Sequence, residues 1–467
     1  MDYYHDACTY RASKLEDPLM FVREFTHVLI LGCGKTGLSI ARYLKRKHVK
    51  TSFYDANKLI IDKIKNIQDI QIVSSFFGEL KEHFFNGIDC IAVSPGVDLR
   101  NPLFKKLKEN GVKFCNDISL FLEETNLLTT KVIGVTGTNG KTTVCSILEK
   151  ILQKSQIKVK AAGNIGYPVL DIEDAHDLNI LILELSSFQI ELLNFSEIDV
   201  GIILNISEDH MDRYDSLEEY LRIKAKLLDQ SKIKIINRDD SYLNTLQHKT
   251  TVSFGLSQPK AKLDYSLDMQ SSSTYIVNDT GLRVDISNLK LPGRHNQLNV
   301  MAAIAGIRAI YPNFNSFESV LIDIKGIPHR LEWIRHLNGI DFYNDSKATN
   351  VGATIVALES FNNSNIFLIA GGDSKKQSLL PLKNILESKV KGLFLIGHDA
   401  SIFENCFSNI SSLKIEKCKD MKEAVFLSYK QAKSGDVVLL SPACASYDMY
   451  DNYIERGNDF KYLIEEL

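Results

Sequence analysis

The sequence predicts an α/β protein of three domains, each built around a parallel sheet. Two observations lead to this prediction. The chain has 467 residues, which suggests about three domains of roughly 150 residues each. Apolar runs of strand length also alternate with segments of helical periodicity along most of the chain, as in parallel sheets connected by helices.

The composition is that of an ordinary globular protein. Hydrophobic residues make up 44% and charged residues 24% of the chain, and the net charge is -3. These values indicate no basic surface for nucleic acid, and no apolar run approaches the roughly 20 residues of a membrane helix. The eight cysteines include no CxxC pair, and the N-terminus lacks the pattern of a signal peptide. We therefore expect a cytoplasmic protein with reduced cysteines and with no nucleic-acid or membrane partner.

The first domain is predicted over residues 27–120, after an N-terminal extension of residues 1–26 whose role the sequence does not indicate. An apolar run at 27–31 leads into Gly32-Cys33-Gly34-Lys35-Thr36-Gly37 and a helical stretch, and a second strand ends at Asp55. A GxGxxG turn with an acid about twenty residues later predicts a Rossmann-like domain that binds a ligand containing pyrophosphate. NAD and a nucleotide sugar both meet this description.

A further loop of the first domain, Ser94-Pro95-Gly96-Val97, follows an apolar run at 88–93. Such a loop falls at the carboxyl end of a parallel sheet, where open α/β folds bind their ligands. A plain turn is the alternative interpretation.

The central domain is predicted over residues 121–326 and carries the most informative motif of the chain. Residues 134–143 (GVTGTNGKTT) lie between a predicted buried strand and an amphipathic helix, so they predict the phosphate loop of a P-loop ATPase-type domain. Glycines let backbone N–H groups approach phosphate oxygens, while Lys141 supplies positive charge and Thr142 a hydroxyl for Mg2+. Val135 stands where the general pattern has glycine, and a glycine- and threonine-rich turn without function is the alternative.

Two other predicted strands of the central domain end in ionisable residues. Glu184 follows the apolar run 180–183, and an acid at a strand tip beside a phosphate loop is a natural oxygen ligand for Mg2+. A capping or surface glutamate is the alternative. Residues 205–213 (NISEDHMDR) follow the run 200–204, which places His210 at the same edge of the sheet, although a histidine taken alone is more often structural.

The third domain is predicted over residues 327–467, after a linker at 326–330 (GIPHR). Its expected strands at 366–370, 392–396 and 436–440 alternate with helical stretches, which predicts a C-terminal Rossmann-like α/β domain. Two of these strands end in polar loops, 371–375 (GGDSK) and 441–446 (SPACAS).

In this order, the motifs resemble those of the Mur ligases, the ATP-dependent enzymes that add amino acids during peptidoglycan synthesis. The resemblance covers nearly the whole chain after about residue 27, and the family's ATP loop departs from the general glycine pattern in the same way as Val135. Further matching segments are ELSSFQ (184–189), NISEDHMDR (205–213), HN (295–296), PHR (328–330), NDSKATN (344–350), GGD (371–373) and LSPACAS (440–446).

Within the family, the compact first domain and the ending at residues 446–457 favour the branch that adds D-glutamate to UDP-N-acetylmuramoyl-L-alanine. The resemblance then implies that the first glycine turn holds UDP and not NAD. The residues implied for the sugar nucleotide are Gly34, Lys35, Thr36, Asp55, Ser94, Pro95 and Gly96.

The resemblance also implies an ATP site shared by the second and third domains. ATP would convert the alanyl carboxylate into an acyl phosphate, which the amine of D-glutamate then attacks. The implied ATP-binding residues are Gly137, Thr138, Asn139, Gly140, Lys141, Thr142, Thr143, Asn299, Arg330 and Asp345. The implied catalytic residues are Lys141, Asn164, His210, Lys224 and Lys347.

Two Mg2+ sites follow from the resemblance, with Thr142, Glu184, His210 and Lys224 as the implied ligands. Lys224 would act as a carbamate formed with CO2, because a carbamate is an anion and assists a metal site that an ammonium would oppose. The spacing from His210 is one residue shorter than expected of the family, so Lys226 is a rival for this role. A simple surface lysine is the alternative for either.

For D-glutamate, the resemblance implies Thr349, Lys375, Ser446, Tyr447 and Tyr453. Tyr453 stands where the family usually has phenylalanine, which adds a hydroxyl near the substrate. The third domain is expected to close over ATP and D-glutamate and so to exclude water from the acyl phosphate. Only small-molecule substrates are expected, and the protein is expected to be a monomer.

Four alternatives to this function remain at the level of the sequence. A sibling ligase would add a different amino acid, and an enzyme similar to folylpolyglutamate synthase would share the ATP core but would lack the first domain. An NAD-dependent enzyme would leave the Lys141 loop unexplained. A non-catalytic ATP-binding regulator would not need the full set of candidate catalytic groups.

Overall fold

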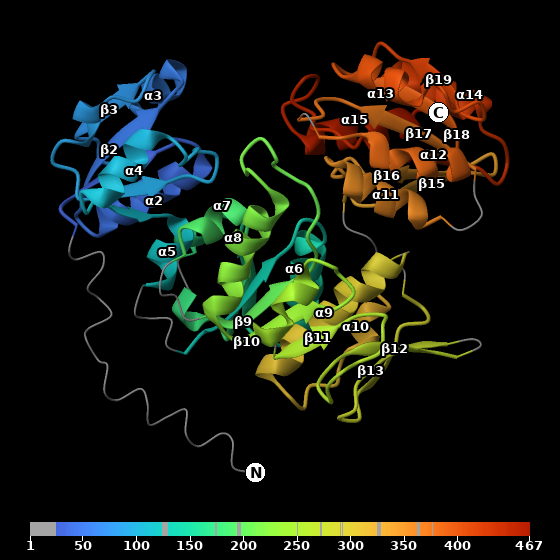
Figure 1. The fold of residues 1–467 in the computed structure, drawn as a ribbon, viewed down its shortest axis with the longest axis horizontal. Coiled ribbons are helices and arrows are strands. Elements are labelled where there is room, and N and C mark those ends of the chain that lie inside the picture. Colours follow the sequence, from blue (N-terminus) through green and yellow to red (C-terminus); the bar gives the residue numbers. More distant parts are fainter. Residues whose placement is uncertain are drawn as a thin grey trace.

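The computed structural model describes residues 25–123, 129–172, 175–193, 198–249, 251–270, 273–289, 291, 293–324, 328–361, 365–375 and 377–467. These residues form three lobes that follow one another along the sequence (Figure 1). The three-domain α/β prediction is therefore confirmed. Most of the expected N-terminal extension, residues 1–24, and part of the expected linker, residues 326–327, lie outside the described residues. None of the described helices is long and apolar enough to cross a membrane.

The first lobe contains a parallel sheet of five strands in the order β3-β2-β1-β4-β5. Its strands are β1 (His27–Leu31), β2 (Lys50–Asp55), β3 (Ser74–Phe77), β4 (Cys90–Val93) and β5 (Lys113–Cys115). Its helices are α2 (Lys35–Arg46), α3 (Lys58–Ile64), α4 (Pro102–Glu109) and α5 (Asp117–Leu122). The strand order reverses at β1, between β2 and β4, so a ligand crevice is expected at the carboxyl ends of these strands.

The middle lobe contains a parallel sheet of six strands in the order β11-β10-β9-β6-β8-β7. Its strands are β6 (Lys131–Thr136), β7 (Val159–Gly163), β8 (Ile180–Glu184), β9 (Ile198–Ile203), β10 (Ser231–Asn237) and β11 (Val252–Phe254). Its helices are α6 (Lys141–Lys154), α7 (Ser187–Glu191), α8 (Leu217–Asp229), α9 (Arg294–Ile310) and α10 (Glu318–Leu321). Because β6 pairs with both β8 and β9, the loops that follow these three strands lie side by side.

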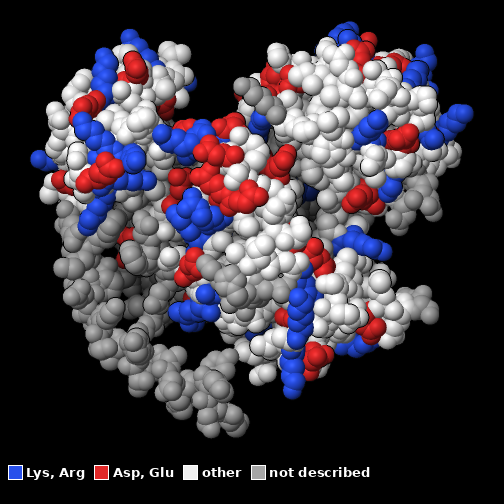
Figure 2. Space-filling model, viewed as in Figure 1, with Lys and Arg blue, Asp and Glu red and all other residues white. Residues whose placement is uncertain are grey.

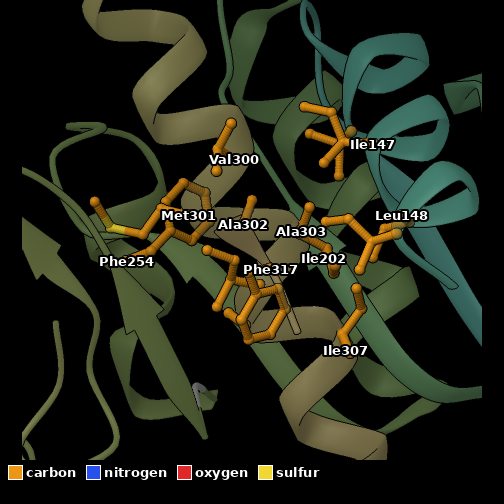
Figure 3. Close-up of a cluster of buried hydrophobic side chains, with 14 of the residues drawn as sticks. Ile147, Leu148, Ile202, Phe254, Val300, Met301, Ala302, Ala303, Ile307 and Phe317 are labelled. Carbon is orange, nitrogen blue, oxygen red and sulfur yellow. The ribbon is translucent and has the colours of Figure 1, made fainter. Parts of the chain in front are cut away.

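The middle lobe also carries an antiparallel sheet of three short strands, which the sequence analysis did not predict. The strands are β12 (Ser266–Met269), β13 (Thr274–Val277) and β14 (Arg283–Asp285). Helix α9 packs between this sheet and the parallel sheet, and residues 299–307 of the helix are all buried. Figure 3 shows Met301 and Ala303 of α9 among Phe254, Ile202 and Phe317, in the largest core of the described chain.

The third lobe contains a sheet of six strands in the order β15-β16-β20-β17-β18-β19. Strand β15 (Glu332–Leu337) is antiparallel to β16 (Ile340–Asn344), and the other pairings, between β16, β17 (Ile366–Gly371), β18 (Val390–Ile396), β19 (Lys414–Lys417) and β20 (Val437–Leu440), are parallel. The helices are α11 (Val351–Glu359), α12 (Lys383–Lys389), α13 (Ala400–Phe407), α14 (Met421–Gln431) and α15 (Tyr453–Glu465).

Replacing Phe317 with alanine tests the core around α9. Phe317 is fully buried, so Phe317→Ala removes the packing of an aromatic ring and leaves a cavity, at a cost of about 3–5 kcal/mol in the free energy of unfolding. Urea unfolding followed by circular dichroism measures this change. Leu263→Ala is the control, because Leu263 is 49% exposed and its truncation should change stability by less than about 0.5 kcal/mol. Equal effects of the two substitutions would contradict the described core.

Candidate active site

The phosphate loop runs from the end of β6 to the start of α6. Gly137 has a φ of 153° and Gly140 a φ of 85°, so both adopt backbone conformations that favour glycine. A Cβ atom on Gly140 would lie 2.6 Å from Oδ1 of Asn299, so the side chain of Asn299 also excludes larger residues from this turn. Helix α6 begins directly after Gly140, and its first N–H groups therefore face the loop.

The loop after β9 holds the phosphate loop in place. The backbone N–H of Asn139 donates to Oδ1 of Asn205 at 2.8 Å, and the Asn205 amide nitrogen donates to the Asn139 carbonyl at 3.0 Å. The N–H of Ser207 donates to Oγ1 of Thr138 at 3.0 Å. Asn205 lies in a segment that matched the family, but the sequence alone gave it no role.

Lys141 is turned toward its own loop. Its ammonium donates to the carbonyl oxygens of Gly137 at 2.8 Å and Thr138 at 2.9 Å. Burial lowers the pKa of Lys141, and the nearby carboxylate of Glu184 opposes this shift. Among the described residues, the hydrogen-bond partners of this side chain are therefore backbone carbonyls, although it carries the charge that the sequence assigns to phosphate binding.

Lys224 of α8 contacts the same loop as Lys141. Its Nζ lies 3.2 Å from both Oγ1 of Thr136 and the carbonyl oxygen of Gly137, and 4.7 Å from the centroid of the Tyr220 ring. Lys224 is 1% exposed, and burial and the charge of Lys141 hold its pKa well below its usual value. Lys226 points elsewhere and donates to the carbonyl of Glu191, so the structure places only Lys224 of the two candidates at the loop.

Glu184 ends β8, directly beside Val135 of β6. Its Oε1 accepts a hydrogen bond from the side-chain amide of Asn164 at 2.9 Å, which brings the predicted catalytic Asn164 to the site. Its buried Oε2 has no hydrogen-bond partner among the described residues. A buried carboxylate oxygen without a partner is costly, so this atom is available for a cation.

The side-chain oxygens at this edge of the middle-lobe sheet decide whether it suits Mg2+. Within the described ranges, no group of three or more His, Cys, Asp or Glu side chains could hold a metal ion. Mg2+ does not require such a cage, because it usually keeps several waters and binds one or two protein oxygens together with substrate phosphates. The oxygens of Glu184 and Thr142 therefore fit a magnesium ion that is bound together with a nucleotide.

His210 lies in the loop after β9 and has a φ of 57°, an unusual conformation for a residue other than glycine. Its Nε2 is 3.7 Å from Oδ2 of Asp209, and its ring packs on the edge of Phe188 with centroids 5.0 Å apart. Burial lowers the pKa of His210, and Asp209 opposes this shift. A neutral imidazole has a free nitrogen for a metal ion or a hydrogen bond.

The third lobe reaches the phosphate loop through Arg330. The Arg330 guanidinium donates to Oγ1 of Thr142 at 2.7 Å, and the side chain of Asn350 contacts that of Asn139 at 3.5 Å. A cavity of about 90 Å³ lies at this seam. It is lined by Asn139, Gly140, Thr143, Leu291, His295, Asn296, Asn299, Arg330, Leu331, Asp345, Lys347, Ala348, Ala353, Val356 and Ala357.

Asp345 and Lys347 enter this cavity from the end of β16. Oδ1 of Asp345 accepts from the Leu331 N–H at 3.2 Å and its Oδ2 from the Ser441 hydroxyl at 2.8 Å, while burial raises its pKa to about 7. Burial and the charge of Arg330 lower the pKa of Lys347 to about 8. The Lys347 ammonium lies 3.8 Å from the centroid of the Tyr453 ring.

The residues predicted for D-glutamate are brought together only in part. Thr349 donates its N–H to the carbonyl of Lys347, and Tyr453 contacts the Lys347 ammonium, so these two lie at the seam. Ser446 is buried beside the third-lobe sheet, and Lys375 has a φ of 50° after the loop at 371–373. Tyr447 is 74% exposed, so it does not share the enclosed position of Ser446.

A second, larger cavity of about 1070 Å³ lies at the switch point of the first-lobe sheet. Cys33 of the glycine turn donates its N–H to Oδ2 of Asp55 at 3.0 Å, and the Ser94 hydroxyl donates to the carbonyl of Gly32 at 2.8 Å. The lining includes all seven residues predicted for the sugar nucleotide. Gly32, Cys33 and Val97 also line the cavity and belong to the two loops that the sequence analysis singled out. The further lining residues, which the sequence analysis missed, are Tyr54, Ala56, Leu80, Asp98, Arg100 and Asn101.

The raised pKa of Asp345 predicts a pH dependence of stability. In the folded protein its pKa is about 7, above the usual 3.8, so between these values the folded state holds a proton that the unfolded state has lost. The stabilisation that this proton provides therefore declines as pH rises, by about 1.4 kcal/mol per unit within the window. Asp345→Asn should abolish this decline.

The fluorescence of Trp333 measures this effect, because it is the single tryptophan of the chain and lies in β15 of the same lobe. The free energy of unfolding of both proteins is measured in urea at several pH values. The value for the wild type minus that for Asp345→Asn should fall between pH 5 and pH 7 and should be constant above pH 8. A difference that does not vary with pH would contradict the assigned environment of Asp345.

Comparison with known proteins places these features in one family. Three family models match the chain: the MurD-like N-terminal domain of Mur ligases over residues 26–116, the Mur ligase middle domain over 135–307, and the Mur ligase glutamate ligase domain over 329–444. Two solved structures share the fold at 20% identity. A pseudomurein peptide ligase type C from Methanothermus fervidus covers 94% of this chain and 99% of its own with a TM-score of 0.61. The MurF ligase from Thermotoga maritima, solved in complex with ADP, covers 97% and 100% with a TM-score of 0.60.

Two curated relatives are more similar in sequence. The UDP-N-acetylmuramoylalanine--D-glutamate ligase of Nitrosomonas europaea is 38% identical over 452 residues, which cover 93% of this chain and 94% of that protein. The ligase of the same name from Coxiella burnetii (strain RSA 331 / Henzerling II) is 39% identical over 445 residues, which cover 94% and 98%. Because this similarity extends over nearly the whole length of both proteins, the chain belongs to the Mur ligase family.

Proposed function

We propose that the protein is an ATP-dependent ligase that joins D-glutamate to the alanyl carboxylate of UDP-N-acetylmuramoyl-L-alanine, as part of peptidoglycan synthesis. The relatives that carry this activity in their names support the choice of substrates. The observation that carries the proposal is the group of Lys141, Lys224 and Glu184 around the phosphate loop, which Arg330 of the third lobe joins through Thr142. A bound polyphosphate would pair with the positive charges of this group, and a cation would pair with the carboxylate of Glu184.

The chemistry requires activation, because a carboxylate is a poor electrophile. Transfer of the γ-phosphoryl group of ATP to the carboxylate oxygen gives an acyl phosphate and ADP. The amine of D-glutamate then attacks the carbonyl carbon, the new C–N bond forms, and the C–O bond to phosphate breaks from the tetrahedral intermediate. Phosphoryl transfer needs positioning and charge neutralisation more than covalent help from the protein.

The proposed roles in the ATP site follow from position. Lys141 exchanges its two carbonyl partners for phosphate oxygens, and Arg330 and the N–H groups at the start of α6 add positive potential. Thr142 and Glu184 would hold the first Mg2+ and His210 the second, and the ions would neutralise charge on the phosphates. Asn299, Asp345 and Lys347 line the cavity at the seam between the lobes, where they would contact the nucleoside.

Lys224 is proposed to react with CO2. A buried lysine with a lowered pKa has a larger neutral fraction, and the neutral amine has the lone pair that bonds to the carbon of CO2 while a proton is released. The product is a carbamate anion beside Lys141. This change replaces the repulsion between the charges of Lys141 and Lys224 with an attraction, which gives Lys224 a physical reason to be modified.

D-glutamate is proposed to bind at the third lobe, with Lys375 and Ser446 near its carboxylates and Thr349, Tyr447 and Tyr453 around it. Arg330 and Lys347 connect this region to the phosphate loop, so closure of the third lobe would bring the amine to the acyl phosphate and exclude water. A cytoplasmic location, a monomeric state and domain boundaries near residues 120 and 326 are parts of the same proposal.

The release of phosphate from ATP tests this function. It should require both UDP-N-acetylmuramoyl-L-alanine and D-glutamate, and L-alanine, glycine or a diamino acid should not replace D-glutamate. Release with one of these other amino acids would indicate a sibling ligase. Binding of ATP without substrate-dependent release would contradict the proposal.

Lys141→Ala should reduce turnover by at least about a hundredfold without unfolding the protein, because it removes a cation from the phosphoryl-transfer site. Lys131→Ala is the control, since Lys131 begins β6, the strand that leads into the phosphate loop, but its side chain is 50% exposed and pairs with Asp199. The control should retain full activity. Full ligase activity in Lys141→Ala would remove Lys141 from the mechanism.

Lys224→Arg and Lys226→Arg distinguish the two candidate carbamates. Arginine keeps the positive charge but does not form a carbamate, so Lys224→Arg should lower turnover by about a hundredfold or more, an effect of the size seen when a catalytic electrostatic group is lost. Lys226→Arg should stay near the wild-type rate, because Lys226 contacts only the Glu191 carbonyl among the hydrogen-bond partners described. The reverse result, measured by phosphate release, would assign the carbamate to Lys226.

A further inference from the structure

A continuous series of contacts connects the first-lobe cavity to His210. Asp98 lines the cavity, and its Oδ1 is 3.4 Å from Nε of Arg213, which belongs to the middle lobe. Arg213 is 9% exposed, so most of its side chain is enclosed between the two lobes. The contact therefore joins a loop of the predicted sugar-nucleotide site to the loop that carries His210.

Arg213 is connected to His210 in two ways. Its backbone N–H donates to the His210 carbonyl at 2.8 Å. Its guanidinium carbon lies 4.8 Å from the centroid of the Phe188 ring, and Phe188 also contacts the imidazole of His210, at 5.0 Å between centroids. A shift of the guanidinium would therefore move the ring on which His210 packs.

Asp98 is shared between two arginines. Its Oδ2 accepts a hydrogen bond from Arg100 at 2.7 Å, and Arg100 also donates to the carbonyl of Asp212 at 2.9 Å. Arg213 in turn has Glu191 at 3.7 Å on the middle-lobe side. Figure 2 shows acidic and basic side chains side by side where the first and middle lobes adjoin.

These ion pairs contribute little to stability, because Asp98 is 47% exposed and Arg100 is 50% exposed. Their arrangement has a clearer consequence for a ligand. Arg100 lines the cavity, and a diphosphate bound there would compete with Asp98 for its guanidinium. Asp98, released by Arg100 and repelled by the diphosphate, would then pair more closely with Arg213.

We propose that Arg213 is a positioning residue that couples occupancy of the sugar-nucleotide cavity to the orientation of His210, through Asp98 on one side and Phe188 on the other. This inference rests on the proposed function, in which the cavity binds UDP. In this proposal, Asp98, Arg100 and Arg213 transmit the binding of the sugar nucleotide to His210. The phosphoryl-transfer site is thereby prepared before the chemistry begins.

Nuclear magnetic resonance of protein labelled with 15N-histidine tests the coupling without catalysis. UDP is the probe, and the His210 signal is assigned by its loss in His210→Gln. UDP should shift the His210 signal in the wild type. In Asp98→Asn and in Arg213→Gln the shift should be lost or strongly reduced, while UDP still binds within about fivefold of its wild-type affinity, as the loss of an exposed ion pair allows.

Glu82→Gln is the matched control. It also removes one carboxylate charge from an exposed ion pair of the first lobe, the pair with Lys106 at 2.7 Å, and it should leave the shift unchanged. Asp98 is 47% exposed, so Asp98→Asn should fold normally. It therefore provides the test if Arg213→Gln does not fold. An equal His210 shift in the wild type and in the variants would overturn the coupling while leaving the proposed function intact. Failure of UDP to bind the wild type would overturn both.

Discussion

The site depends on the enclosure of two lysines and one glutamate around the same glycine turn. Lys224 and Glu184 are buried and Lys141 is partly buried. Among the described residues, the hydrogen bonds of both ammonium groups go to hydroxyl or carbonyl oxygens, and Oε2 of Glu184 has no hydrogen-bond partner. Charges removed from water without full pairing are costly. A protein that keeps such groups at a glycine loop therefore gains most from an anionic ligand and a cation, which would supply the missing charge partners.

The sheet order makes this concentration of charge possible. Because β6 lies between β8 and β9, the phosphate loop, Glu184 and the loop of Asn205 and His210 meet at one edge, and α8 adds Lys224 from the side. The other two lobes approach the same edge, the first through Asp98 and the third through Arg330. Three separate domains can therefore contribute to one reaction, each with its own binding surface.

The sequence predicts those parts of the site that depend on local backbone. The loop from Gly134 to Thr143 and the turn from Gly32 to Gly37 are recognisable because short-range geometry determines their residues. Contacts between distant segments were not predictable, and neither Asp98 with Arg213 nor Asn205 with Asn139 follows from spacing. Lys224 and Lys226 differ by two positions in a helix, so only the packing of α8 determines which of them faces the loop. Strands β12–β14 and β3 are among the strands that the sequence analysis missed, because they are short and half polar.

The central claim is that the charged edge of the middle sheet binds the phosphates of a nucleotide. Isothermal titration calorimetry in the presence of Mg2+ tests it directly by comparing adenosine with a non-hydrolysable ATP analogue. If the phosphates pair with Lys141 and the accompanying Mg2+ contacts Glu184, the analogue should bind at least about a hundredfold more tightly than adenosine, because several charge-assisted hydrogen bonds are gained. Equal affinities for the two compounds would contradict the account.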